Sequence, residues 1–247
     1  MRTHALFAAL MTAGLALLPA GCSRGAEHGA DSQSASTPAD WSGLRDFSAV
    51  EATGPDDVII TQGKDFSVKV EGKPGEVAKL EIEVDGDTLE IGRKKRLGIS
   101  WSSSSRGVTV RVTMPRLTAV EATGSGNIQV DKVDGPSLKA ELTGSGNVDI
   151  AAATVGTLKA ELTGSGDIKI GGSAETLDVS VTGSGNFDGA GLKAGRAKAS
   201  VLGSGDSGFA SDGPVDISIM GSGNVTVKGK AQCKSSIMGS GEAHCAP

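Results

Sequence analysis

One tripeptide, Gly-Ser-Gly, recurs seven times in the second half of this 247-residue chain. The copies begin at Gly124, Gly144, Gly164, Gly183, Gly203, Gly221 and Gly239. The intervals between them are 20, 20, 19, 20, 18 and 18 residues. A period this regular is typical of proteins that stack one structural unit on the next, so the repeat constrains the fold more than any single residue does.

Between the tripeptides, apolar and polar side chains alternate. The second, fourth and sixth residues before most corners are apolar, as in Leu142, Ala140 and Leu138, and the polar residues Lys139 and Glu141 stand between them. This alternation indicates strands with one buried face, so each repeat predicts two short strands and two turns. Because a unit of this size cannot close a core alone, successive units should share a continuous aliphatic interior.

These features predict an all-β fold: a right-handed parallel β-helix-like solenoid of about seven coils. A meander of antiparallel hairpins is the alternative. Stacking in register would superimpose the corners at about 4.8 Å and align the corner serines from Ser125 to Ser240 in a ladder. The residues that follow the corners are Asn127, Asn147, Asp167, Asn186, Asp206, Asn224 and Glu242. No two carboxylates are neighbours in this series, which favours side chains that pile up along one axis.

The last repeat carries cysteine where earlier repeats carry inward aliphatic residues. Cys233 lies six residues before the glycine that opens the last corner, and Cys245 lies six residues after it. Both thiols should therefore point into the last coil, where a disulfide is expected in an exported protein. In the chain-entropy model such a cross-link contributes roughly 3 kcal/mol. A metal site that includes His244 is the alternative, although His244 falls on an outward register.

Residues 41–119 lack the tripeptide but alternate strongly, and residues 120–247 hold the repeats. Strands are expected at 58–60, 66–70, 80–84, 89–91 and 108–114, with turns at 62–63, 73–75 and 85–87, so hairpins are predicted here. The sequence from Val50 to Gly54 duplicates that from Val120 to Gly124. The echo predicts that 41–247 is a single solenoid domain whose N-terminal part is a strand-hairpin cap.

One basic patch interrupts this N-terminal part. It comprises Arg93, Lys94, Lys95 and Arg96, followed by Trp101. A solvated hairpin loop is one interpretation of the patch. Contact with anionic lipid headgroups or an acidic glycan is the other.

The first 21 residues have the organisation of a signal peptide: Arg2 precedes a largely apolar stretch over residues 5–18. Ala20-Gly21-Cys22 resembles the end of a bacterial lipobox. That resemblance implies a mature chain of residues 22–247 with fatty acyl chains such as palmitate on Cys22, anchored in a membrane of the cell envelope. Secretion with cleavage near Ala20 is the alternative. Residues 22–40 contain no aliphatic side chain larger than Ala and predict a disordered tether.

Composition excludes several functions. The formal net charge of −5 provides no global basic field, so nucleic acid is not an expected partner. The predicted folded part contains a single histidine, His244, so a Ser-His-Asp arrangement is not expected. The sequence shows no phosphate-loop or zinc pattern, and no cofactor is expected.

The export leader, the strand-rich opening, Met114-Pro115-Arg116-Leu117 and the Gly-Ser-Gly-Asn repeats together resemble the bacterial head GIN domain family of auto-transporter adhesins. The resemblance covers about Phe47 to Cys245. It implies a β-helix-like envelope protein, brings no catalytic residues to this chain, and carries an expectation of homo-oligomers.

Three functions are consistent with this sequence. The first is a non-catalytic envelope lipoprotein, adhesin-like or structural, whose repetitive surface binds an envelope glycan or a protein. The second is a calcium-binding roll, because Gly-Ser-Gly-Asn/Asp resembles half of the repeat in such proteins, although Asn replaces Asp at four of the seven corners. The third is a glycan-acting β-helix enzyme, for which Asp149, Asp167, Lys169 and Asp188 are the candidate cluster.

Overall fold

The computed structural model of the chain describes residues 41–94 and 107–246, which all fall within one compact unit. The predicted signal peptide, lipidation site and tether therefore lie outside the described residues. The same holds for Lys95, Arg96 and Trp101 of the basic patch.

The described residues form strands almost throughout, with one helical turn, α1 (Pro74–Val77). The strands are β1 (Ala49–Gly54), β2 (Asp57–Gln62), β3 (Ser67–Glu71), β4 (Leu80–Asp85), β5 (Thr88–Arg93), β6 (Thr109–Met114), β7 (Ala119–Gly124), β8 (Asn127–Gly144), β9 (Asn147–Gly164), β10 (Asp167–Gly183), β11 (Asn186–Gly203), β12 (Ser207–Ser211), β13 (Pro214–Gly221), β14 (Val225–Lys228), β15 (Gln232–Gly239) and β16 (Ala243–Ala246).

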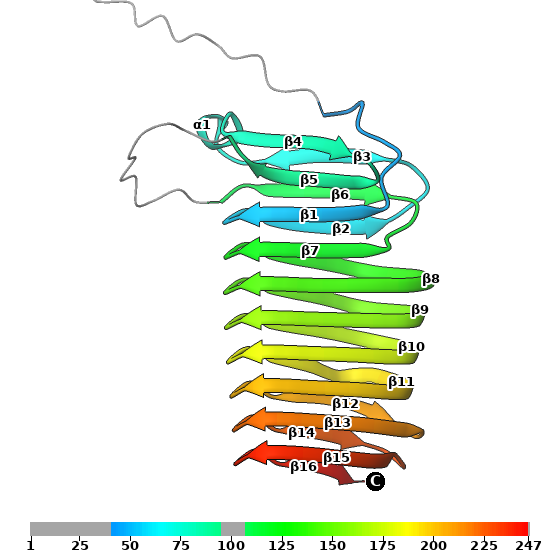
Figure 1. The fold of residues 1–247 in the computed structure, drawn as a ribbon. Coiled ribbons are helices and arrows are strands. Elements are labelled where there is room, and N and C mark those ends of the chain that lie inside the picture. Colours follow the sequence, from blue (N-terminus) through cyan, green and yellow to red (C-terminus); the bar gives the residue numbers. More distant parts are fainter. Residues whose placement is uncertain (1–40, 95–106, 247) are drawn as a thin grey trace, which may run out of the picture. The chain divides into compact units, whose positions relative to one another are not determined.

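The strands stack in two facing layers (Figure 1). The front layer contains, in order, β4, β5, β1, β7, the C-terminal halves of β8 to β11, β13 and β15. The back layer contains β3, β6, β2, the N-terminal halves of β8 to β11, β12, β14 and β16. Neighbouring strands are parallel except for the pairs β3–β6 and β4–β5.

The predicted solenoid is confirmed, and the chain makes six complete turns between the first and the last Gly-Ser-Gly corner. In Figure 1 it runs to the corner along the nearer face and returns along the farther face as it descends, which is a right-handed winding. The alternative of an antiparallel meander is wrong because equivalent residues of successive repeats pair in parallel, for example Leu138 with Leu158.

The core consists of the side chains that point between the two layers. Leu138, Ala140 and Leu142 of the front layer are buried, as are Ile128 and Val130 of the back layer. These are the positions that the alternation assigned to the interior. Aliphatic side chains thus form one continuous core along the stack, and stability comes from each coil covering the next.

Each corner needs glycine at two positions, for two different reasons. The first glycine adopts a left-handed φ, +129° at Gly144, which side chains disfavour. Its carbonyl accepts two hydrogen bonds from the corner of the next coil, as Gly144 O does from the amides of Ser165 and Gly166 at 2.9 and 3.1 Å. At the second glycine a Cβ would lie 2.0 Å from the carbonyl oxygen of the coil before, as at Gly146 over Gly126.

The predicted second turn of each repeat is absent from the middle coils. Instead β8, β9 and β11 are continuous strands of 18 residues that bend from the back layer to the front layer. Parallel pairing continues around this bend, as between Asp134 and Thr154, so the polar backbone stays hydrogen-bonded without a tight turn. Separate strands in the two layers reappear in the C-terminal coils, with β12 and β13.

The N-terminal part continues the stack, but not in chain order. The chain forms β1 and β2 first, runs outward to β3, α1 and β4, and then returns through β5 and β6 before it reaches β7. The two duplicated segments lie side by side in register, because Val50 pairs with Val120 and Gly54 with Gly124. The expected antiparallel cap is therefore restricted to β3 and β4, while β5 and β6 pair in parallel with β1 and β2.

Two of the predicted turns differ from the structure. The turn at 85–87 does connect a hairpin, β4 to β5. The segment at 73–75, however, begins α1, because Pro74 occupies the first helical turn, where a missing N–H costs nothing. The turn at 62–63 leads from β2 to β3, which do not pair with each other.

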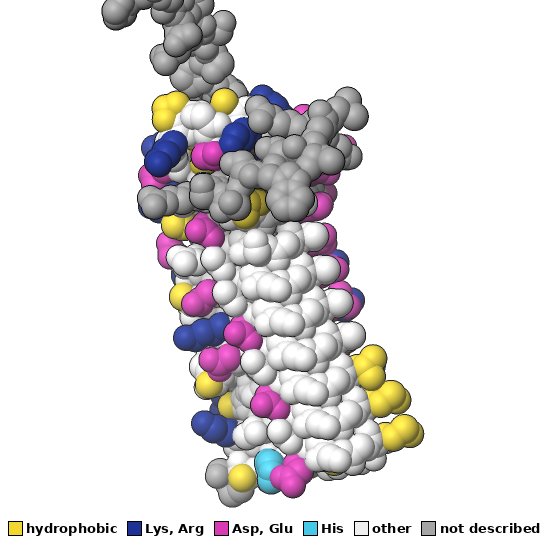
Figure 2. Space-filling view, turned by 90° about the vertical axis from the view of Figure 1, so that its left-hand side faces the viewer, with side chains coloured by type: hydrophobic (Ala, Val, Ile, Leu, Met, Phe, Trp, Pro, Cys, Tyr) yellow, Lys and Arg dark blue, Asp and Glu magenta, His cyan; other side chains and the backbone are white. Residues whose placement is uncertain are grey.

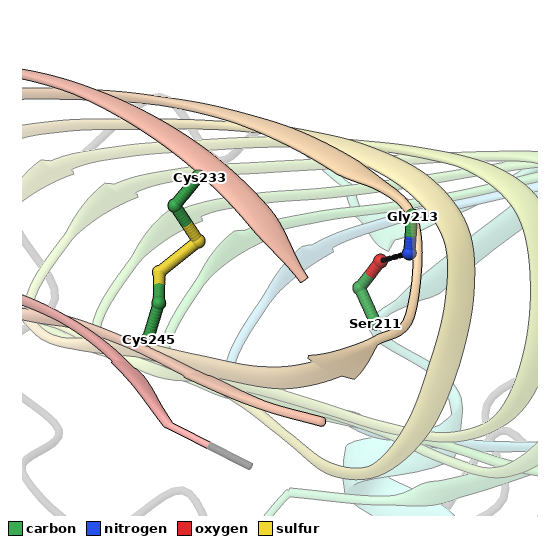
Figure 3. Close-up of a disulfide and its surroundings, with 4 residues drawn as sticks. All are labelled: Ser211, Gly213, Cys233 and Cys245. Carbon is green, nitrogen blue, oxygen red and sulfur yellow. Dashed lines mark hydrogen bonds between the residues drawn. A yellow bond between two sulfur atoms is a disulfide. The ribbon is translucent and has the colours of Figure 1, made fainter. Parts of the chain in front are cut away.

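At the C-terminal end, a disulfide joins the two layers. Cys233 of β15 and Cys245 of β16 are bonded, with their Cα atoms 6.6 Å apart, across the interior (Figure 3). They stack on the buried residues Val215 and Val227. Cys233 is nevertheless only half-buried and Cys245 is exposed, because no further coil among the described residues covers this end.

Candidate functional site

The outer surface of the front layer consists of columns of residues at equivalent positions in successive strands. The column three residues before each corner glycine, here named the Glu column, contains one glutamate per strand at the N-terminal end of the stack. Its members, in spatial order, are Glu83, Glu90, Glu51, Glu121, Glu141 and Glu161. The column continues as Ser180, Ser200, Ser218 and Ser236, so this column loses its negative charge toward the C-terminal end.

The column directly before the corner glycine changes its chemistry along the same direction. It begins as Thr53, Thr123, Thr143, Thr163 and Thr182 and continues as Leu202, Met220 and Met238. The last three, named here the apolar stripe, are 48%, 52% and 68% exposed. Figure 2 shows hydrophobic side chains projecting from one margin of the C-terminal coils, beside an uncharged corner surface.

The Glu column is charged unevenly. Glu121 and Glu141 share Lys139, whose Nζ lies 3.0 and 2.6 Å from their carboxylates, and both contacts raise the pKa of Lys139. Glu90 has carboxylates on both sides in the column. Partial burial, followed by the charges of Glu51, Asp85 and Glu83, raises the pKa of Glu90.

The residues that follow the corners form the predicted ladder. Asn147 donates its side-chain amide to Asn127 Oδ1 at 2.9 Å, and Asn186 donates both its backbone and side-chain N–H groups to Asp167 Oδ1 at 3.0 and 2.9 Å. Asp206 and Asn224 continue the same pattern. The ladder oxygens thus bind the next coil. In residues 41–94 and 107–246, no group of three or more His, Cys, Asp or Glu side chains is arranged to hold a metal ion.

The cluster considered for glycan chemistry is distributed over adjacent strands of the back layer. Lys169 lies between Asp149 and Asp188, each directly opposite it on a neighbouring strand. Alternating charges in such a position stabilise strand pairing. The fourth member, Asp167, accepts the ladder hydrogen bonds of Asn186 instead.

The structure assigns Arg93 of the basic patch a structural role. Its guanidinium donates to both carboxylate oxygens of Asp56 at 2.7 and 2.6 Å and to Glu76 at 3.0 Å. Asp56 is buried and also accepts the backbone N–H of Val108 at 2.9 Å. Hydrogen bonds to Asp56, then to Glu76, raise the pKa of Arg93. Arg93 therefore closes the corner at Gly54-Pro55-Asp56, where Gly-Ser-Gly is replaced. Lys94 is exposed, and its Nζ donates to Ala78 O at 3.3 Å.

The apolar stripe and the Arg93–Asp56 pair were missed by the sequence reasoning. The stripe has a simple signal, since the residue before the corner glycine changes from Thr to Leu202, Met220 and Met238 in the last three repeats. The ion pair has none, because Asp56 and Arg93 are 37 residues apart and belong to no repeat.

The fold and its surface define a class of protein: a parallel β-solenoid that presents long, regular columns of side chains to its surroundings. The chain matches the family model described as "Putative auto-transporter adhesin, head GIN domain" over residues 46–231. It belongs to this family. Membership in an adhesin family indicates an exported or envelope-associated protein.

Solved structures show the same fold. A putative adhesin from Bacteroides fragilis is 23% identical, with a TM-score of 0.74, and the match covers 82% of this chain and 93% of that chain. A putative lipid binding protein from Parabacteroides distasonis is also 23% identical, with a TM-score of 0.63 and the same coverage. None of the curated proteins searched matches the sequence. Within residues 41–94 and 107–246, no helix has the length and hydropathy needed to cross a membrane.

Proposed function

We propose that this protein is a non-catalytic binding module of the bacterial cell envelope, exported and held at a membrane by a lipid on Cys22. Residues 22–40 act as a tether, and the solenoid contacts a protein partner through the apolar stripe. The observation that carries the proposal is the exposure of Leu202, Met220 and Met238 in three successive coils.

The chemistry around the stripe supports its role as a contact surface. Exposed large apolar side chains that gather on one surface mark interaction sites. The columns on either side of the stripe are serines at these coils, for example Ser218 and Ser222. A partner that covers the stripe would therefore not have to desolvate charges in these columns, unlike one that covered the Glu column.

A protein partner fits the stripe better than a glycan does. Sugar rings pack on exposed aromatic platforms, whereas the aromatic residues in the described part of the chain are buried or half-buried. They are Trp41, Phe47, Phe66, Phe187 and Phe209. Methionine side chains are flexible and polarisable, and they suit protein surfaces that adapt to a partner.

The stripe can be tested by giving the C-terminal coils the residue that the other coils carry. Cells that produce this protein naturally should lose their attachment to the surface that they bind when they carry the variant L202T/M220T/M238T. Cells that carry the control variant, in which Thr123, Thr143 and Thr163 are changed to Ser, should attach as wild-type cells do. Both variants should retain the wild-type circular dichroism spectrum. Wild-type attachment by the stripe variant would contradict the proposal. If the wild-type protein sediments with lipid vesicles and the stripe variant does not, the stripe binds lipid and the proposal of a protein partner is wrong.

The anchor is tested separately. Cys22→Ser should move the protein from the membrane fraction to the soluble fraction of the cells, and labelled palmitate should be incorporated by the wild-type chain alone. A variant that stays in the membrane fraction would contradict anchoring through Cys22.

A further inference from the structure

In the part of the chain that the structure describes, the two strands at the C-terminal end of the stack each have one free edge. Within the described chain, β15 pairs only with β13, and β16 only with β14. The amides of Gln232 and Ser240 donate to Gly213 O and Gly221 O of the preceding coil at 3.0 and 2.9 Å. The carbonyls of Glu242 and Ala246 accept from the residues of the preceding coil at 2.9 and 3.0 Å. These even-numbered residues therefore direct their backbone groups into the stack.

The residues between them direct their backbone groups the other way. Along a strand, successive residues present N–H and C=O to opposite sides. The backbone N–H and C=O groups thus face the open edge at Cys233, Ser235 and Ile237 of β15 and at Ala243 and Cys245 of β16. Such a row of backbone groups is a template for pairing with another chain.

The side chains at this end are also those of an interior. Ile237 occupies the same register as Ile219, but Ile237 is 44% exposed, whereas Ile219 is 1% exposed. Ala243 stacks on the buried Val225 and is itself only half-buried. The open end therefore leaves both apolar surface and backbone groups without the cover that every earlier coil has.

We propose that a second copy of this chain covers this end in a two-fold symmetric dimer. In it β15 pairs with β15 of the partner, antiparallel and centred on Ser235, and β16 pairs with β16, centred on Ala243. The inference does not rest on the proposed function, because it uses neither the apolar stripe nor the anchor.

One register in β15 fixes the register in β16. Cys233 and Cys245 lie opposite each other across the interior, Ser235 follows Cys233 by two residues, and Ala243 precedes Cys245 by two. A two-fold axis through both layers at Ser235 therefore also passes through Ala243. Inward side chains face inward side chains, Cys233 lies opposite the partner's Ile237, and the free backbone groups of these odd-numbered residues meet as hydrogen-bonded pairs.

Charge selects this register over its neighbours. With the axis at Ser235, Glu242 lies opposite the partner's His244 on both sides of the axis, and Lys234 lies opposite the partner's Ser236. Moving the axis one residue places Lys234 against its own copy or Glu242 against its own copy, and like charges directly opposite each other are destabilising. At present Glu242 Oε2 and His244 Nε2 are 2.8 Å apart on the exposed surface of one chain.

A second copy of the chain has the geometry that is needed to cover both strands at this end. The occupant must offer two antiparallel strand edges at the separation that the disulfide imposes on β15 and β16 (Figure 3). A single strand from another protein would cover one layer and leave the other open. The same end of a second molecule offers both edges at the matching separation, in a closed isologous interface.

The test uses the chain from residue 22 onward with Cys22→Ser, which carries neither a lipid nor a thiol at this position. Sedimentation equilibrium over a concentration series should show a monomer–dimer equilibrium. Ser235→Pro, which removes the amide on the axis and is compatible with an edge strand, should raise the dimer dissociation constant at least tenfold, whereas Ser235→Ala should leave it within about twofold, since it keeps the amide. A chain that stays monomeric at every concentration would overturn the proposal.

Cysteine cross-linking tests the register independently of stability. The double variant K234C/S236C should form a covalent dimer under mild oxidation, because position 234 faces position 236 of the partner, whereas neither single variant should. Cross-linking by K234C alone or by S236C alone would show that the axis lies elsewhere and would overturn the proposed register.

The charge swap E242K/H244E should dimerise as the parent does, and E242K alone should raise the dissociation constant several-fold.

Discussion

The two ends of the solenoid differ in how the terminal coil of the stack is held in place. At the N-terminal end, the chain leaves the repeat, builds β3, α1 and β4, and covers the first coil with antiparallel strands. At the C-terminal end, it keeps the repeat and joins the two layers with the Cys233–Cys245 disulfide. A cap of antiparallel strands covers the core at one end of the stack, whereas a cross-link holds the two layers together at the other end.

The difference extends to the outer surface. Near the N-terminal end, the front layer carries the Glu column, and the pair of Asp56 and Arg93 closes the corner beside it. Near the C-terminal end it carries serine and the apolar stripe. The closed corner thus lies near the N-terminal end, and the surface that we propose for contact lies near the C-terminal end.

The largest expected effect separates the middle of the stack from its end. Gly146→Ala would place a Cβ 2.0 Å from Gly126 O, and Gly241→Ala would place one 2.1 Å from Gly223 O. The clashes are similar, but a terminal coil can detach while a middle coil cannot. Gly146→Ala should lower the free energy of unfolding by more than about 4 kcal/mol, and Gly241→Ala should disturb the last coil alone. Thermal unfolding and hydrogen exchange measure both, and equal losses would contradict the comparison.

The next effect concerns the N-terminal closure. Asp56→Asn removes the charge that holds Arg93 while keeping an oxygen for the amide of Val108. Breaking a buried ion pair in this way should cost about 3 kcal/mol, measured by urea unfolding. Glu71→Gln, which breaks the exposed pair with Arg111, is the matched control and should cost less than about 1 kcal/mol.

At the other end, the double variant C233A/C245A should act locally. The disulfide closes a loop with a sequence separation of 12 residues, so its loss should destabilise the last coil by about 3 kcal/mol. Hydrogen exchange should accelerate in β15 and β16 while β8 and β9 keep their protection. Faster exchange throughout the stack would show that this end supports the whole solenoid.

The smallest effect tests the Glu column. The raised pKa of Glu90 means that its charged form is disfavoured in the folded state, so the stability at this site falls as the pH rises through that pKa. Glu90→Gln should therefore raise the melting temperature slightly at neutral pH, and the gain should shrink in acid. Glu161→Gln, which loses the 2.9 Å contact with Lys159, should give no gain.

Most features of the repeats could be predicted from the sequence, but the second turn of each repeat could not, because the middle coils form continuous strands there. Equivalent positions of the Gly-Ser-Gly units pair directly, so the inward residues, the Asn and Asp ladder and the register of Cys233 and Cys245 could all be read from spacing. The disulfide could be expected because both cysteines replace inward aliphatic residues.

Where the repeat is broken, the prediction was incomplete. The echo at Val50 indicated a coil, but strand partners in β3 to β6 depend on contacts between distant residues, so the spatial order of β5, β1 and β7 could not be read. Asp56 and Arg93 have no periodic context, and Arg93 was interpreted as part of a basic patch. Its long side chain is equally suited to a surface or to a buried carboxylate, and only the position of Asp56 decides between them.

The corner hydrogen bonds all have the same polarity. The amides of Ser145 and Gly146 donate to Gly124 O, and those of Ser165 and Gly166 donate to Gly144 O, so each coil supplies donors to acceptors that the preceding coil already holds. A polypeptide that emerges N-terminus first from a ribosome or a translocon therefore meets a finished template at every step. Folding can proceed vectorially, one coil at a time, with disulfide closure as its final event.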